Sequence, residues 1–247
     1  MFKELVKFIR DQYQTDTTIA LHEPVFSGNE NKFVQQAISS TFVSSSGHFV
    51  NQFEKDITKY TESPSAVAVI NGTAALHIAL KLAGVKEDDC VITQPLTFIA
   101  TCNAICYCAA EPIFIDVDKD TMGLSSKALE IWLTENAKLD IDGNCRRSRD
   151  DKIIRACIPM HTFGHPVHLE ALLDVCNRWG IAIIEDAAEA LGSTLNNKHL
   201  GTFGKAGILS FNGNKIITSG SGGMILTDQK NSEIAKHLCT TAKIVDK

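Results

Sequence analysis

This 247-residue sequence has no long apolar run, no Cys-x-x-Cys pair and no excess of basic charge. No uninterrupted apolar stretch approaches the roughly 20 residues that a membrane-spanning helix needs, and the N-terminus lacks the apolar core of a signal peptide. The formal net charge is −5, so no basic surplus is available to neutralise a nucleic-acid backbone. We therefore expect a cytoplasmic protein that binds neither membranes nor nucleic acid.

The cysteines and histidines do not form a recognisable metal motif. The eight cysteines are scattered, mostly within apolar runs, which favours reduced thiols in the core. His161, His165 and His168 are close in the sequence, but Gly164 and Pro166 prevent the single helical face on which such ligands would converge. We expect no metal site.

The order of apolar segments predicts the fold class. With 44% hydrophobic and 21% charged residues, the chain has the composition of a globular protein with one large core. Apolar, β-branched segments alternate with segments of helical periodicity, which predicts an α/β fold with a mostly parallel sheet and helices on both faces. The expected strands are Ala66–Ile70, Cys90–Thr93, Pro112–Asp116, Ile153–Pro159, Ile181–Glu185, Ala206–Phe211 and Gly223–Thr227, and the expected helices are Ala74–Ala83, Ser126–Lys138 and Leu169–Trp179.

The segment Asp140–Lys152 is polar and carries charges of both signs, so we expect a surface excursion there. Its arginines could contact an anionic ligand, although a solvated loop is the favoured interpretation.

A turn between the first expected strand and the first expected helix is a candidate anion site. Asn71-Gly72-Thr73-Ala74 directs backbone N–H groups and the positive end of a helix dipole to the edge of the sheet. By itself this turn is an ordinary helix cap. It becomes more informative because other polar groups follow strands at the same edge, where ligands of open α/β sheets bind.

Two later strands deliver those polar groups. Glu185 and Asp186 follow an apolar strand, where an acid without a partner would be costly to bury, and the next strand leads into Ser210 and Lys215. An anion site, an acid and a lysine together suggest pyridoxal phosphate (PLP): the phosphate on the helix, the carboxylate on the pyridine nitrogen and the lysine as the Schiff base. The alternative is a site for another phosphate, with Asp186 and Lys215 paired to unrelated groups.

Six short motifs cover essentially the whole chain. They are His22-Glu-Pro-Val-Phe-Ser-Gly-Asn-Glu30, Asn71-Gly-Thr-Ala-Ala-Leu-His77, Leu96-Thr-Phe-Ile-Ala-Thr-Cys-Asn103, Met160-His-Thr-Phe-Gly-His-Pro166, Glu185-Asp-Ala-Ala-Glu189 and Ser210-Phe-Asn-Gly-Asn-Lys215. In these motifs, their order and their spacing, the sequence resembles the nucleotide-sugar aminotransferases of PLP fold type I. The most similar branch acts on 4-keto-6-deoxy sugars in the bacillosamine, perosamine and legionaminic acid pathways.

The resemblance implies a role for each candidate residue. Lys215 would form the Schiff base and move protons between cofactor and sugar, and Asp186 would keep the pyridine nitrogen protonated. Phe98 would stack on the ring. Glu189, where the family often has glutamine or histidine, would lie beside the phenolic oxygen of the cofactor. The phosphate would be held by Gly72, Thr73 and Ala74 at the helix end and by the hydroxyl of Ser210.

The resemblance also implies an activity and a domain organisation. Glutamate would donate an amino group to a keto group of a nucleotide-linked 4-keto-6-deoxy sugar, a step in the synthesis of surface polysaccharide precursors. Related deoxysugar dehydratases have histidine at the position of Lys215, so amino transfer is favoured over a dehydratase or an inactive PLP-binding fragment. We expect residues 1–247 to form the large PLP-binding domain, with an N-terminal arm over about residues 1–45. The small C-terminal domain would be missing, and the full-length protein would be a homodimer.

Overall fold

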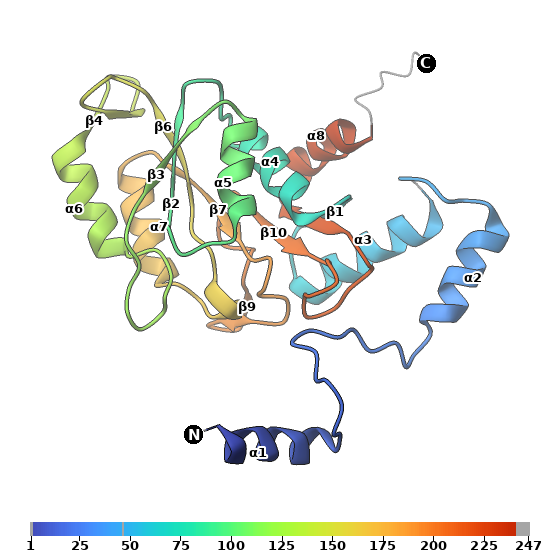
Figure 1. The fold of residues 1–247 in the computed structure, drawn as a ribbon. Helices are drawn as coiled ribbons and strands as arrows, with labels where there is room; N and C mark the ends of the chain where they lie inside the picture. The colour runs from blue at the N-terminus through green and yellow to red at the C-terminus, as the bar shows by residue number, and fades with distance from the viewer. Residues whose placement is uncertain (1, 46, 241–247) are drawn as a thin grey trace, which may run out of the picture.

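The computed structural model describes residues 2–45 and 47–240. A seven-stranded sheet with the order β1-β11-β10-β7-β6-β2-β3 organises this part of the chain (Figure 1). Its strands are β1 (Ser65–Val69), β2 (Cys90–Thr93), β3 (Glu111–Phe114), β6 (Ile154–Ile158), β7 (Ala182–Asp186), β10 (Ala206–Ser210) and β11 (Gly223–Thr227). All seven predicted strands are confirmed, and their bounds differ from the expected ones by at most two residues.

The strand directions determine at which edge of the sheet the carboxyl ends of the strands meet. The β10–β7, β7–β6, β6–β2 and β2–β3 pairs are parallel, whereas β11 is antiparallel to both of its neighbours, β1 and β10. The predicted mostly parallel sheet is therefore confirmed. Because β11 alone runs in the opposite direction, the carboxyl ends of the other six strands meet at one edge.

Helices cover both faces of the sheet, as predicted (Figure 1). One core joins the sheet to α4 (Gly72–Leu82), α5 (Ile99–Tyr107) and α8 (Gln229–Cys239). The other joins it to α3 (His48–Thr61), α6 (Ser126–Asn136) and α7 (Leu169–Arg178). Successive strand residues alternate between the two, so that Ile183 packs in the second core and Ile184 in the first.

The N-terminal segment stands apart from these cores. None of the residues of α1 (Lys3–Tyr13) or α2 (Glu30–Ser40) is buried. In Figure 1 both helices lie away from the sheet, joined to it through α3. Across the described residues, every helix is too short or too polar to cross a bilayer.

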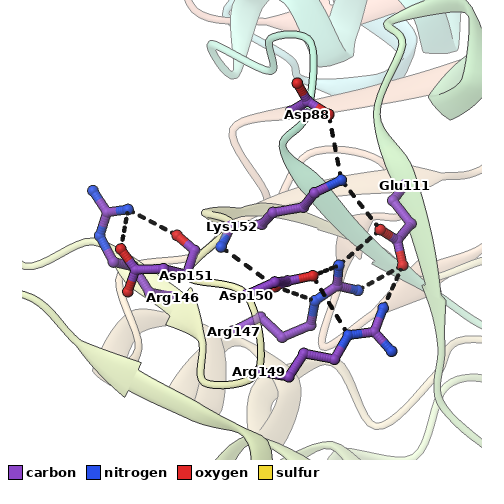
Figure 2. Close-up of polar contacts among 8 residues, drawn as sticks. All are labelled: Asp88, Glu111, Arg146, Arg147, Arg149, Asp150, Asp151 and Lys152. Carbon is purple, nitrogen blue, oxygen red and sulfur yellow. Dashed lines mark hydrogen bonds and ion pairs between the residues drawn. The ribbon is translucent and has the colours of Figure 1, made fainter.

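Two small hairpins and a 3-10 turn, η1 (Thr162–Gly164), complete the described part of the chain. The hairpins are β4 (Ala137–Leu139) with β5 (Cys145–Arg147), and β8 (Thr194–Leu195) with β9 (Lys198–His199). The first hairpin lies in the expected surface excursion over Asp140–Lys152, most of which is exposed, but the segment is not a fully solvated loop. Cys145 is fully buried in the hydrophobic core. Arg147 is 3% exposed, because its guanidinium meets carboxylates from two directions (Figure 2).

Candidate functional site

A cavity of about 330 Å³ lies at the carboxyl ends of β7 and β10, beside the turn from β1 into α4. This volume lies within the range of small-molecule sites. Four separate segments of the chain bring seven of the eight predicted site residues to its wall: Gly72, Thr73, Phe98, Asp186, Glu189, Ser210 and Lys215. The exception is Ala74.

The turn at the start of α4 has the geometry of an anion site. Asn71 caps the helix, and its Oδ1 accepts the N–H of Ala74 at 2.8 Å. The Ala74 N–H is therefore already engaged, while Gly72 and Thr73 lie in the cavity wall. A Cβ on Gly72 would come within 3.1 Å of Ser210 Cβ and 3.3 Å of its Oγ, so the glycine lets the helix end approach the hydroxyl closely. The backbone N–H groups at the start of α4 and the hydroxyl of Ser210 therefore lie side by side in the cavity wall.

Asp186 is a buried acid whose hydrogen-bond partners carry no charge. It ends β7 and is 3% exposed. Its Oδ2 accepts the hydroxyl of Thr101 at 2.7 Å, and its Oδ1 accepts the N–H of Ala188 at 3.3 Å. Burial raises the pKa of Asp186, whereas these two hydrogen bonds and the charges of Lys215 and His161 oppose the rise. A cationic atom in the cavity would therefore find an acid that is not already in a salt bridge with a close cation.

Lys215 faces an acid across the cavity. It follows β10 in a turn, where its N–H donates to the carbonyl of Asn212 at 3.0 Å. Its Nζ donates to Oε1 of Glu189 at 3.0 Å, and the two side chains are 12% and 32% exposed. Glu189 is predicted to neighbour a cofactor oxygen. In this structure it is the ion-pair partner of the lysine, so the two charges compensate each other.

Phe98 contributes an aromatic ring to the same cavity. It precedes the first residue of α5 and is 68% exposed, although it lines the cavity wall. An aromatic ring exposed at a cavity wall offers a flat face on which a planar ligand can stack.

Glu185, which precedes Asp186, does not belong to this site. The two side chains project to opposite faces of the sheet because successive residues of a strand alternate. Glu185 is fully buried and accepts three backbone hydrogen bonds of 2.6 to 2.8 Å, from Gly201, Phe203 and Gly204. Its Oε2 also lies 3.1 Å from Nε2 of His161.

The environment of Glu185 favours its charged form. Burial by itself would raise the pKa of Glu185, but the His161 contact and the backbone hydrogen bonds lower it below its usual value. Glu185 therefore holds the loop that follows β9 against the sheet.

A second cavity of about 380 Å³ adjoins the first at Lys215 and Asn214. The loop that contains these two residues forms one side of it, and the segment from His22 to Phe26 forms another. Lys215 therefore borders two cavities, and the first turn of α4, with Gly72 and Thr73, lines only the first of them.

Comparison with known proteins identifies the family. The model of the DegT/DnrJ/EryC1/StrS aminotransferase family matches residues 25–243. The chain belongs to this family. The resemblance in the six motifs is thus confirmed, although the role of each residue is still a prediction.

Among curated relatives, "Putative pyridoxal phosphate-dependent aminotransferase EpsN" of Bacillus subtilis is 40% identical over 91% of this chain and 55% of its own length. GDP-perosamine synthase of Escherichia coli O157:H7 is 37% identical over 86% of this chain and 54% of its own length. The chain spans about half the length of these relatives.

Solved structures agree with this assignment. An aminotransferase from Psychrobacter cryohalolentis superimposes with a TM-score of 0.75 at 27% identity, covering 87% of this chain and 50% of its own. DesI, determined in the presence of its TDP-sugar product, gives a TM-score of 0.73 at 25% identity with the same coverage. The fold is therefore that of PLP fold type I aminotransferases, as predicted.

Proposed function

We propose that this chain is the cofactor-binding part of a PLP-dependent aminotransferase. Its substrates would be glutamate, as amino donor, and a nucleotide-linked 4-keto-6-deoxy sugar, as acceptor. The observation that carries the proposal is the cavity in which a helix N-terminus, a buried acid and a lysine meet. The family and the names of its relatives, which mention pyridoxal phosphate and GDP-perosamine, support the same conclusion.

The residues of the cavity fit the groups that PLP carries. The N–H groups of Gly72 and Thr73 and the hydroxyl of Ser210 are suited to its phosphate. Asp186, whose close partners are uncharged, is suited to a protonated pyridine nitrogen. Lys215 supplies the amine for covalent attachment. When bound, PLP supplies an electron-withdrawing ring, which is the chemistry that amino transfer requires.

The Lys215–Glu189 pair would hold the reacting amine in place. Glu189 compensates the charge of Lys215 at 3.0 Å and keeps its Nζ at the junction of the two cavities. We place the phenolic oxygen of PLP beside Glu189, where two anions would repel each other. A hydrogen-bond donor to Glu189 would relieve this repulsion, and in the present structure Lys215 Nζ donates to it. The adjoining cavity, which shares Lys215, would receive the sugar.

The homodimer of the full-length protein is also part of the proposal. Large apolar side chains beside the cavity residues are exposed: Ile99 by 60%, Ile216 by 60% and Ile217 by 51%. A second copy that covers them would remove apolar surface from water. Native mass spectrometry should detect two chains per particle.

Borohydride reduction of the PLP-loaded protein tests the cofactor assignment. Peptide mapping should find the reduced pyridoxyl group on Lys215, and Lys215→Ala should abolish the label. Lys205→Ala is the matched control, because Lys205 is exposed and precedes the first residue of β10 at the opposite edge of the sheet. A label on a lysine other than Lys215 would refute the assignment.

A visible spectrum tests the reaction class. Aminotransferase chemistry predicts a yellow protein whose absorbance falls when glutamate is added. A yellow protein that does not respond to glutamate would instead favour a dehydratase or an inactive PLP-binding fragment.

A further inference from the structure

Two threonine hydroxyls lie in series behind the carboxylate of Asp186. Thr101, the third residue of α5, is fully buried, and its Oγ1 lies 2.7 Å from Oδ2 of Asp186. Thr97 Oγ1 lies 2.8 Å from Thr101 Oγ1 and 3.1 Å from the sulfur of Met160. None of the proposed cofactor contacts explains these hydroxyls.

The number of protons determines the direction of the series. A hydroxyl has one proton to donate, and a carboxylate is a stronger acceptor than a neutral hydroxyl. With Asp186 ionised, Thr101 donates to Asp186 and must accept from Thr97. Thr97 can donate its one proton either to Thr101 Oγ1 or to the weakly accepting sulfur of Met160. Thr101 is the better acceptor of the two, because its hydroxyl already donates to an anion. Both hydroxyl dipoles then point toward the acid.

We propose that Thr101 is the positioning residue for Asp186: its hydroxyl holds Oδ2, stabilises the charged carboxylate and leaves Oδ1 to bind the protonated ring nitrogen of the cofactor. The inference rests on the proposed function as far as the ring nitrogen is concerned. The other bond to the carboxylate, from the Ala188 N–H to Oδ1, is long at 3.3 Å, so Oδ1 keeps accepting capacity.

Thr101 also links the acid to the stacking ring. Its N–H donates to the carbonyl of Phe98 at 3.1 Å, within the first turn of α5. The same residue therefore connects the group beside the ring nitrogen to the group expected on the ring face. The positive end of the α5 dipole adds to the stabilisation of the anion.

The charges around Asp186 do not replace this hydroxyl. Lys215, after β10, and His161, after β6, act on Asp186 through space, and Lys215 is paired with Glu189. The Nε2 of His161 contacts Glu185, on the other face of the sheet, and its Nδ1 accepts the N–H of Val167. Removal of the Thr101 hydroxyl should therefore raise the pKa of Asp186 further.

The test compares Thr101→Val, which removes the hydroxyl at nearly constant volume, with Thr101→Ser, which keeps it. Thr93→Val is the matched control, because Thr93 is also fully buried and donates at 3.0 Å, but to the carbonyl of Ile158. Thr97→Val removes only the outer hydroxyl. The readouts are the PLP dissociation constant and the titration of the Asp186 carboxyl in cofactor-free protein, followed by carbon-13 NMR and assigned with Asp186→Asn.

Thr101→Val should weaken PLP binding roughly tenfold, the effect of one hydrogen bond to a charged group, and should move the Asp186 titration to higher pH. Thr101→Ser should restore both values, Thr97→Val should show a smaller change in the same direction, and Thr93→Val should change neither. Unchanged values in Thr101→Val and Thr97→Val, or an equal loss in Thr93→Val, would overturn the proposal. If the unaltered protein binds no PLP, the proposed function fails, but the carboxyl titration still tests Thr101.

Discussion

The two edges of the sheet use charge in opposite ways. At the amino ends of β2, β3 and β6, four acidic and four basic side chains form the cluster in Figure 2: Asp88, Glu111, Asp150, Asp151, Arg146, Arg147, Arg149 and Lys152. At the carboxyl ends, Asp186 has only uncharged close partners, and the Lys215–Glu189 pair borders open space. In the first arrangement each charged side chain has an oppositely charged partner within the protein, whereas in the second the Asp186 carboxylate has none close by.

Arg147 shows how complete the amino-edge cluster is. Its guanidinium donates to both oxygens of Glu111 at 2.7 Å and to both oxygens of Asp150 at 2.9 and 2.6 Å. The hydrogen bond from Arg147 lowers the pKa of Glu111 to about 2 and that of Asp150 to about 2. Charges paired in this way anchor the β4–β5 hairpin to β3. Unbalanced charge, and not charge density, therefore marks the ligand site of this sheet.

Asp186→Asn should produce the largest effect, because it removes the unbalanced charge at the carboxyl edge. A neutral amide cannot stabilise a charged pyridinium, so turnover should fall on the order of 10²–10³-fold. PLP should still bind, through its phosphate and Lys215, but at least as weakly as in Thr101→Val. Ser210→Ala removes one of several phosphate contacts and should cost about tenfold. Steady-state kinetics with glutamate and a 4-keto nucleotide sugar provide the measurement. Equal, mild losses in the two variants would mean that Asp186 is not the ring partner.

Arg147→Met instead removes the guanidinium at the centre of the charge cluster on the amino-end edge of the sheet. Glu111 and Asp150 would lose their shared partner, but their side chains are 37% and 33% exposed, so we expect a loss of about 2 kcal/mol in unfolding free energy, below that of a fully buried pair. Urea unfolding measures the loss, and PLP affinity should not change. Arg149→Met, at a side chain that is 67% exposed, should stay within about 0.5 kcal/mol. Similar losses in both variants would contradict the central role of Arg147.

Low pH should lower the free energy of unfolding, because protonation of Glu111 removes its ion pair with Arg147. Its pKa in the folded protein is about 2, below the ordinary value near 4.3, so its contribution is complete above pH 4.3 and is lost as the pH falls toward 2. With solvent screening at 37% exposure, the contribution is about 1 kcal/mol. Glu111→Gln should make the stability profile less steep in that window, where Asp150 still titrates, whereas Glu87→Gln, at an exposed residue, should leave the profile unchanged. Identical profiles for wild type and Glu111→Gln would rule out this contribution.

Glu189→Gln should produce the smallest effect, because it alters a charge that Lys215 already compensates. We expect a change in turnover of less than about tenfold and a shifted pH dependence of the absorbance of the bound cofactor. Glu233→Gln, at an exposed residue of α8, should leave the spectrum unchanged. If Glu189→Gln also has no spectral effect, Glu189 does not lie beside the phenolic oxygen.

Local signals in the sequence predicted much of the molecule. Apolar runs such as Ile181–Glu185 indicated the strands, and Asn71 indicated the start of α4, because strand burial and helix capping depend on neighbouring residues. The three expected helices do not include α1, α2, α3, α5 or α8. Of these five, α5 gives the weakest local signal. It has apolar residues on all sides, including buried Ile105 and exposed Ile99 and Tyr107, so no amphipathic stripe indicates it.

Such local signals do not predict contacts between residues that are far apart in the sequence. Nothing near Arg147 indicates that Glu111, which is 36 positions away, would remove it from solvent. Likewise, nothing near Thr101 indicates a bond to Asp186, which is 85 positions away. Both pairs form only because the parallel sheet brings separate strands and helices together.

The sequence by itself determined the α/β fold class, the seven strands, the family motifs and the identity of the candidate residues, because each follows from residues that are close along the chain. The resemblance of the motifs already assigned Asp186 to the cofactor, but only the tertiary structure gives the physical reason why Asp186 and not Glu185 enters the cavity. Only the tertiary structure also decided which charges are neutralised within the protein and which are left for a ligand. Strand alternation predicts that two neighbouring acids point to opposite faces, but the packing of α4 and α5 decides which face carries the site.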